Sequence, residues 1–163
     1  MKYELDRGSH SVYSLYYHLV IVVKYRGKAL SSETIRERLK EIIVSLAPNL
    51  GIEILAQEPG TDHHHMLFKA TPTANLSNIV NVIKGTTSRY IRQEFPETKA
   101  ILWGDSFWSD GYFYRSIGST TTQAVQFYIE HSQRKHWIGL DYDTGEQGHE
   151  EQDKPGQTKL DEF

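Results

Sequence analysis

The chain has 163 residues, of which 38% are hydrophobic, 12% aromatic and 24% charged, a composition that suits one folded domain and excludes a disordered polymer or a collagen-like repeat. It contains no cysteine, which excludes disulfides, a thiol nucleophile and cysteine-bound metals. The net charge of −3 is unevenly divided: residues 1–135 contain 16 Lys and Arg against 13 Asp and Glu, and residues 136–163 contain 2 against 8.

The acidic end of the chain predicts a tail. Residues 139–163 are rich in Gly, Gln, Asp and Glu and cannot bury enough apolar area to offset the entropy lost on ordering. We therefore expect a folded domain over residues 1–138 and a disordered tail over residues 139–163. The longest apolar run, residues 19–23, is far shorter than a membrane span, and the N-terminus lacks a secretory pattern. A cytoplasmic protein with no membrane partner is predicted.

The first part of the chain predicts a strand followed by a helix. Residues 12–25 are dense in Val, Ile and Tyr, which predicts a long central strand that ends before Gly27. The Ser31-Ser32 pair can cap a helix, which Pro48 and Gly51 are expected to stop. Its buried face is predicted from apolar residues at helical spacing: Ile35, Leu39, Ile42, Ile43 and Leu46.

Two strands and a second helix are predicted next. Residues 52–58 and 62–70 predict strands that a Pro59-Gly60 turn joins into a hairpin. A second helix is predicted to open at Pro72-Thr73 and to end before Pro96. Its buried face is predicted to contain Leu76, Ile79, Val80, Ile83, Tyr90 and Ile91.

A fourth strand and a last helix complete the predicted fold. Residues 107–117 are aromatic and extended in character, and the hydroxyl residues 119–122 introduce a helix that reaches about residue 135. This order of elements predicts an α+β protein with helices packed on an antiparallel sheet, close to the ferredoxin-like plan.

Three consecutive histidines lie within the predicted third strand. Because side chains alternate along a strand, His63 and His65 share one face and His64 faces the other way. Two imidazoles on one face can chelate a divalent ion if a third group arrives from elsewhere. Spacing alone leaves two interpretations open, a metal site and a set of hydrogen-bonded structural histidines.

A second candidate is Tyr128, in the predicted last helix. Its ring could simply pack in the core, as most tyrosines do. However, His131 and Ser132 follow at three and four residues and share its side of the helix. A nucleophile and a third metal ligand could therefore lie together.

Basic and aromatic residues suggest a nucleic-acid interface. Lys24, Arg26 and Lys28 alternate at the end of the first predicted strand, and others lie along the second helix: Lys84, Arg89 and Arg92. They could bind DNA phosphates, or be ordinary solvated side chains. Four aromatic residues could stack on unpaired bases or belong to the core: Trp103, Phe107, Trp108 and Tyr112.

Several short motifs occur in a characteristic order over roughly residues 10–135. They are Tyr16-Tyr17-His18, Lys24-Tyr25-Arg26, Asp62-His63-His64-His65, Ile83-Lys84-Gly85, Leu102-Trp103-Gly104-Asp105 with Phe107-Trp108 and Tyr112, and the Tyr128 helix. In this order they resemble the single-tyrosine HUH transposases, the TnpA-type enzymes of the insertion-sequence-200/605 (IS200-like) family.

This resemblance implies a DNA transposase. The family cleaves and rejoins single-stranded DNA at the ends of its element, recognises subterminal hairpins and forms a 5′-phosphotyrosine, here on Tyr128. It also implies Mg²⁺ or Mn²⁺ held by His63 and His65, and a homodimer with composite active sites.

Two positions depart from the family pattern. The middle residue of the histidine motif is usually apolar, and here it is His64. The usual glutamine ligand, four residues after the tyrosine, is replaced by Ser132. Helix geometry then favours His131 as the third ligand, followed by Gln133 if a π-bulge restores the register.

Three other functions stay open on sequence grounds. One is a non-catalytic nucleic-acid-binding module on the same ferredoxin-like sheet. Another is a metal-dependent hydrolase that adds Asp62 or Glu58 to the histidines. The third is a domesticated tyrosine transposase that processes repeated palindromes.

Overall fold

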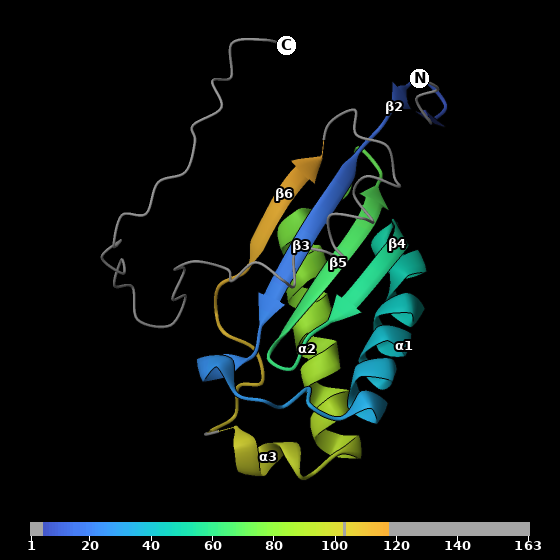
Figure 1. The fold of residues 1–163 in the computed structure, drawn as a ribbon. Helices are drawn as coiled ribbons and strands as arrows, with labels where there is room; N and C mark the ends of the chain where they lie inside the picture. The colour runs from blue at the N-terminus through green and yellow to red at the C-terminus, as the bar shows by residue number, and fades with distance from the viewer. Residues whose placement is uncertain (1–4, 103, 118–163) are drawn as a thin grey trace, which may run out of the picture.

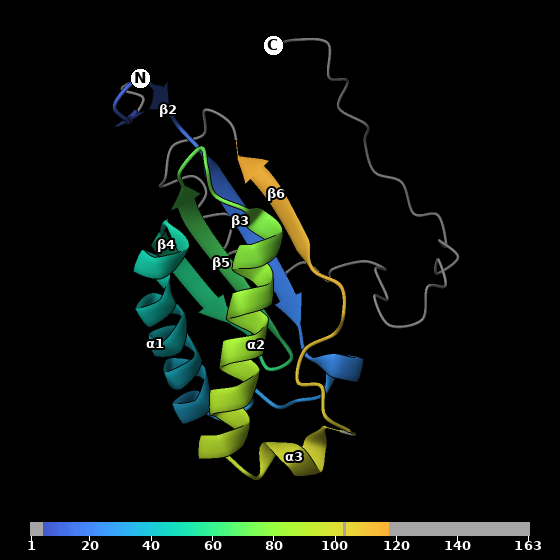
Figure 2. The same cartoon turned by 180° about the vertical axis from the view of Figure 1, so that it is seen from behind.

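The computed structural model describes residues 5–102 and 104–117. Within this part, two long helices cover one face of a four-stranded sheet (Figures 1 and 2). The strands run in the order β4-β5-β3-β6, and neighbouring strands are antiparallel. The bounds of the sheet strands and long helices are β3 Tyr16–Val22, α1 Glu33–Leu50, β4 Ile52–Pro59, β5 His63–Ala70, α2 Leu76–Glu94 and β6 Phe113–Ile117. The predicted α+β, ferredoxin-like architecture is confirmed.

Short elements surround this sheet. Strands β1 (Asp6–Arg7) and β2 (Val12–Tyr13) form a separate antiparallel pair, a 3₁₀ turn covers Lys24–Arg26, and α3 spans Thr98–Ile101. No helix in the described part is long and apolar enough to span a membrane. The predicted last helix and the predicted tail lie outside the described residues.

The core lies between the sheet and the two helices. Alternate residues of the central strands, such as Leu19 and Ile21 on β3 and Met66 and Phe68 on β5, are at most 1% exposed. They pack against the apolar faces of α1 and α2, which contribute Ile35, Leu39, Ile42, Ile43, Ala47, Ile79, Val80, Ile83 and Ile91. The predicted helix faces are largely confirmed, although Tyr90 is exposed and Leu46 half-buried, while Ala47 and Thr87 are buried in addition.

The helix ends differ from the prediction. Helix α1 continues through Pro48 to Leu50, although a proline in the last turn has no N–H to donate to the carbonyl four residues earlier, so α1 lacks one backbone hydrogen bond there. Gly51, with φ of 65°, is the actual stop, and its N–H bonds to the last-turn carbonyls. Helix α2 begins at Leu76, not at Pro72-Thr73, because Asn75 caps it by accepting a bond from the N–H of Asn78 at 3.0 Å.

Two predicted strands prove shorter. The segment predicted as one strand over residues 12–25 is divided into β2, β3 and the 3₁₀ turn, where Tyr25 and Arg26 both have φ of 52°. The segment predicted over residues 107–117 is a strand only from Phe113. Before that point the chain makes one bridge, between Trp108 and Val23.

Candidate active site

The histidines of β5 point to opposite faces of the sheet, as strand alternation predicts. The ring centroids of His63 and His65 lie 4.9 Å apart with the ring planes at 85°. Both rings are on the face opposite α1 and α2, the side of the sheet turned to the viewer in Figure 1. His64 turns toward the helices and is 1% exposed, with Nε2 3.1 Å from Oε1 of Gln57.

His63 is held by the residue that precedes it. Its Nδ1 lies 2.7 Å from Oδ1 of Asp62, a buried carboxylate just before the strand. The other oxygen, Oδ2, accepts from Nε of Arg26 at 3.3 Å and from Nζ of Lys28 at 3.4 Å. This carboxylate therefore connects two cations of the loop after β3 to one imidazole.

His65 is held by a third histidine, on the neighbouring strand. Nε2 of His18 lies 3.0 Å from Nδ1 of His65. Both residues are buried, at 3% and 1% exposure. Strand pairing brings them together: β3 runs antiparallel to β5, with Val20 opposite His65 and His18 opposite Leu67.

Burial keeps these imidazoles neutral. Removal from water, with a smaller contribution from the charge of His63, lowers the pKa of His65 to about 3. Burial and the neighbouring Arg115 lower the pKa of His18 to about 4. Burial raises the pKa of Asp62, but the hydrogen bond from His63 and the nearby Arg26 outweigh it and lower the pKa overall.

The donor set fits a divalent cation in part. Neutral imidazole is the form that binds a metal, and the engaged Nδ1 atoms of His63 and His65 leave Nε2 of each ring as the available donor. Glu58 is paired with His65 across β4 and β5, yet the described residues contain no group of three or more His, Cys, Asp or Glu side chains that could hold a metal. A third ligand must come from elsewhere. The predicted nucleophile Tyr128 and predicted ligands His131 and Gln133 lie outside the described residues.

Gly60 allows the His63 ring to lie against the turn between β4 and β5. A Cβ placed on Gly60 would be 2.5 Å from Cε1 and 2.8 Å from Nε2 of His63. Such distances are far below van der Waals contact, so a residue with a side chain would displace the ring. The Pro59-Gly60 turn was predicted, and the structure gives this reason for its glycine.

The three cations after β3 lie in a turn and loop, not on the alternating strand that the sequence predicted. Lys24 lies 3.5 Å from Asp110 and over the Tyr25 ring. The side chains of Arg26 and Lys28 are 64% and 66% exposed while they contact Asp62. Both cations can therefore meet a phosphate close to the histidines.

The cations of α2 differ in what they contact. Lys84 is half-buried, and its ammonium donates to the carbonyls of Ser109, Asp110 and Gly111 at 2.5, 3.0 and 3.4 Å. Burial, only partly offset by Asp110, lowers its pKa. These bonds hold the segment before β6 against the helix.

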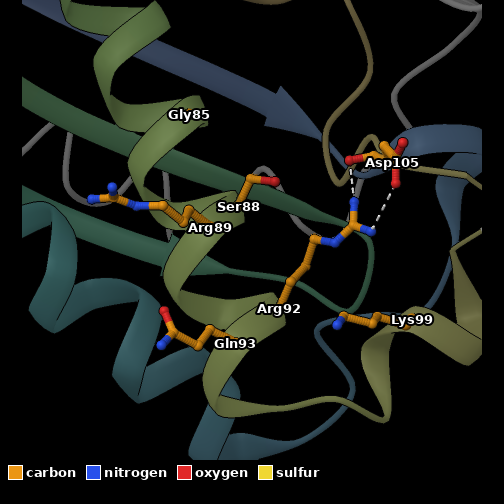
Figure 3. A pocket seen from close by; sticks show the side chains of 7 residues that line it. All are labelled: Gly85, Ser88, Arg89, Arg92, Gln93, Lys99 and Asp105. Atoms are coloured by element: carbon orange, nitrogen blue, oxygen red, sulfur yellow. Dashed lines mark hydrogen bonds and ion pairs between the residues drawn. The ribbon is translucent and has the colours of Figure 1, made fainter.

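The outer side of α2 carries a basic hollow of about 520 Å³. Figure 3 shows Arg92 reaching toward Asp105, to which it bonds, while Arg89 extends away from that pair. The hollow is lined by Gly85, Ser88, Arg89, Arg92, Gln93, Lys99 and Asp105. Most of its lining residues belong to α2, which covers the sheet face opposite to that of His63 and His65 (Figure 2).

Two of the four aromatic candidates for base stacking belong to the core. Phe107 and Trp108 are 1% and 4% exposed, and Nε1 of Trp108 donates to Oγ1 of Thr87 at 3.0 Å. Tyr112 stacks on Tyr114, which is 46% exposed. Trp103 lies outside the described residues.

Sequence reasoning missed two contributors to these sites. His18 stood in a quoted motif but received no role, because its partner lies 47 residues away. Lys99, in the hollow, lies on the short helix α3, which was not predicted. Four residues are too few for an apolar period to mark a helix.

Comparison with known proteins identifies the family. The family described as "Transposase IS200 like" matches residues 11–132. The chain belongs to this family. Among curated IS200-like relatives, "ISDra2 transposase TnpA" of Deinococcus radiodurans is 35% identical over 78% of this chain and 90% of its own length. A "Transposase for insertion sequence element IS200" of Salmonella typhimurium is 29% identical over 80% of this chain and 85% of its own length.

Two solved structures resemble the fold. A transposase candidate from Deinococcus radiodurans gives a TM-score of 0.64 at 33% identity, over 77% of this chain and 95% of its own. A REP-associated tyrosine transposase bound to a REP hairpin gives 0.54 at 14% identity, over 81% and 76%; at that identity the likeness concerns the fold alone. The IS200-like chain is therefore a transposase, a DNA-processing enzyme.

Proposed function

We propose that this transposase cleaves and rejoins single-stranded DNA at the ends of its element through a 5′-phosphotyrosine on Tyr128. The observation that carries the proposal is the pair of histidines, His63 and His65, on one sheet face with both Nδ1 atoms engaged. Tyr128 lies within the part of the chain that matches the family.

The reaction balances without an energy source. The phenolic oxygen of Tyr128 gives up its proton and bonds to phosphorus while the bond from phosphorus to the 3′ oxygen breaks, and that oxygen takes up a proton to leave as a 3′-OH. A later attack by a 3′-OH on the phosphotyrosine joins strands and releases the tyrosine. Mg²⁺ or Mn²⁺ held by His63 and His65 would polarise the scissile phosphate, and imidazole donors suit Mn²⁺ better than Mg²⁺. His131, or Gln133 after it, is proposed as the third ligand.

We assign DNA contacts to two sides of the molecule. Arg26 and Lys28 lie beside Asp62 and His63, where they can hold the strand that is cleaved. Arg89 and Arg92 lie on α2, across the sheet from the histidines, so they are proposed to bind a different segment, such as the stem of a subterminal hairpin. The solved tyrosine transposase bound to a REP hairpin supports a hairpin ligand. Lys24 and Lys84 are retained as weaker candidates because they bond to Asp110 and its neighbours.

Composite active sites in a homodimer are part of the proposal. Two described ligands are one short of the usual minimum, and the tyrosine segment of a second subunit could complete the set. The acidic segment 139–163 is proposed to lie outside the catalytic domain, so its deletion should leave cleavage intact.

Incubation with labelled single-stranded ends of the flanking element and Mn²⁺, followed by a denaturing gel, tests the chemistry. A covalent protein-DNA adduct is expected. Tyr128→Phe should abolish the adduct and keep DNA binding, and Tyr90→Phe, which alters an exposed tyrosine of α2, is the matched control. Fragments without an adduct would indicate a hydrolase, and unchanged DNA a binding module. An adduct formed on dispersed palindromes in place of element ends would indicate a domesticated enzyme.

A further inference from the structure

The two histidines of the proposed metal centre share one feature. Each has its Nδ1 atom in a short contact with a side chain that is itself buried: His63 with Asp62 at 2.7 Å and His65 with His18 at 3.0 Å. Asp62 is the familiar kind of partner, a carboxylate. His18 is unusual because a histidine can accept or donate.

The geometry of the His18–His65 pair is that of an in-plane hydrogen bond. The ring planes are inclined by only 14°, and the centroids lie 5.2 Å apart. With facing nitrogens at 3.0 Å, the rings meet edge to edge and not face to face. The nitrogen lone pair and the N–H bond of an imidazole both lie in the ring plane, so this arrangement aligns them.

We propose that His18 is a positioning residue for the metal centre, which accepts the Nδ1–H of His65 and so fixes Nε2 of His65 as the metal-binding nitrogen. The inference rests on the proposed function only in taking His65 as a ligand. A neutral imidazole carries its proton on one nitrogen, so when His65 donates its Nδ1–H to His18, the lone pair of His65 is on Nε2. The same holds for His63 and its acceptor Asp62.

The pairing also fixes the orientation of the ring. His65 is 1% exposed and lies between His18 and the perpendicular ring of His63. Loss of the acceptor at position 18 would leave a buried N–H without its partner and allow the ring to rotate or change tautomer. Partners of this kind typically change metal affinity by about 10–100-fold.

Mn²⁺ binding to the full-length protein, measured by calorimetry without DNA, tests the inference. His18→Leu should weaken binding by about 10–100-fold, and His18→Gln, whose amide oxygen can accept the same hydrogen bond, should restore most of it. His64→Leu, one residue from His65 but on the other face, is the control and should bind as the wild type does. Wild-type affinity in His18→Leu, or equal loss in His18→Leu and His18→Gln, would overturn the role of His18.

A second measurement does not depend on how the variants fold. ¹⁵N NMR of the metal-free wild-type protein should show His65 protonated at Nδ1, and protonation at Nε2 would overturn the inference. His65→Ala separates this failure from that of the proposed function. If His65→Ala binds Mn²⁺ normally, His65 is not a ligand, and both the inference about His18 and the proposed metal centre are wrong. If His65→Ala loses Mn²⁺ binding but His18→Leu does not, only the inference about His18 is wrong.

Discussion

The side chain of Gln57 orients His64 within the core. Nε2 of Gln57 donates to the carbonyl of Lys40 at 3.2 Å, so its Oε1 faces Nε2 of His64, 3.1 Å away, and accepts a hydrogen bond from the N–H of that nitrogen. Nδ1 of His64 then carries a lone pair, and no hydrogen-bond partner for this buried atom lies within the described residues. The middle histidine of the motif is therefore a core residue with one unsatisfied acceptor.

His64→Leu should be tolerated and can stabilise the protein. The change removes a buried acceptor whose missing bond costs ~1–3 kcal/mol, and it loses one hydrogen bond worth ~0.5–1.5 kcal/mol. We expect a free energy of unfolding between unchanged and ~2 kcal/mol higher, measured by urea denaturation. Mn²⁺-dependent cleavage should persist, whereas His63→Ala and His65→Ala should abolish it. Loss of cleavage in all three would contradict the assignment of faces.

The same residue predicts acid sensitivity of the metal-free protein. Burial first, then the charges of His65, His63 and Lys40, lowers the pKa of His64 from 6.5 to about 3. Between these two pH values the unfolded chain binds more protons at His64 than the folded protein does. The contribution of His64 to the free energy of unfolding is therefore fully present above pH 6.5 and is lost progressively as the pH falls. In EDTA, the loss of stability from about pH 7 to about pH 5 should be ~2 kcal/mol smaller in His64→Leu than in the wild type. If the free energy of unfolding of both proteins changed with pH in the same way, His64 would take up its proton as readily in the folded protein as in the unfolded chain, which contradicts the prediction.

Gly60→Ala should impair the metal centre without removing a ligand. The new Cβ would meet the His63 ring at 2.5 Å, so the ring must move away from its position beside Asp62. Mn²⁺ affinity is expected to fall by about tenfold, in the range typical for displaced ligand supports. Gly85→Ala, where an added Cβ meets nothing within 4 Å, is the control and should bind as the wild type does. Unchanged affinity in Gly60→Ala would show that the ring position does not matter.

Periodic features of the fold were predictable from sequence. Alternation along β5 correctly separated His64 from His63 and His65, and helical spacing identified most of the buried faces of α1 and α2. These succeed because burial of one face imposes a period on the residue types. Thr87 was not predicted to be buried because it is polar and so does not contribute to an apolar period. Its hydroxyl is nevertheless accommodated in the core, since it donates to the carbonyl of Ile83 and accepts from Nε1 of Trp108.

Non-periodic features were not predictable. The turn after β3 has positive φ values at Tyr25 and Arg26, which residues other than glycine rarely adopt and which no local sequence pattern indicates. The candidate site depends on contacts between distant segments. His18 meets His65, and Arg26 meets Asp62 across 36 residues. Such contacts depend on the order and register of the strands. The sequence predicted only the class of fold and not which residues lie opposite one another.

Substitutions of two cations on α2, Lys84 and Arg89, should have different effects: the first should lower stability and the second should weaken DNA binding. Lys84→Met keeps the aliphatic stem but removes the ammonium that three carbonyls of residues 109–111 share. We expect a loss of ~1–3 kcal/mol in stability and little change in the affinity of the folded protein for DNA. Arg89 is exposed and stacks only on Tyr90 among the contacts described, so Arg89→Met should change stability by less than ~0.5 kcal/mol.

Arg89→Met should instead weaken binding to a labelled hairpin and lower the slope of affinity against salt by about one phosphate contact. Urea denaturation and fluorescence anisotropy at two salt concentrations measure the two effects on the same samples. If Lys84→Met is as stable as the wild type but binds DNA more weakly, Lys84 contributes to DNA binding and not to the stability of the fold. Unchanged hairpin binding in Arg89→Met would remove α2 from the DNA-binding surface, because Arg89 is the most exposed of the three α2 cations.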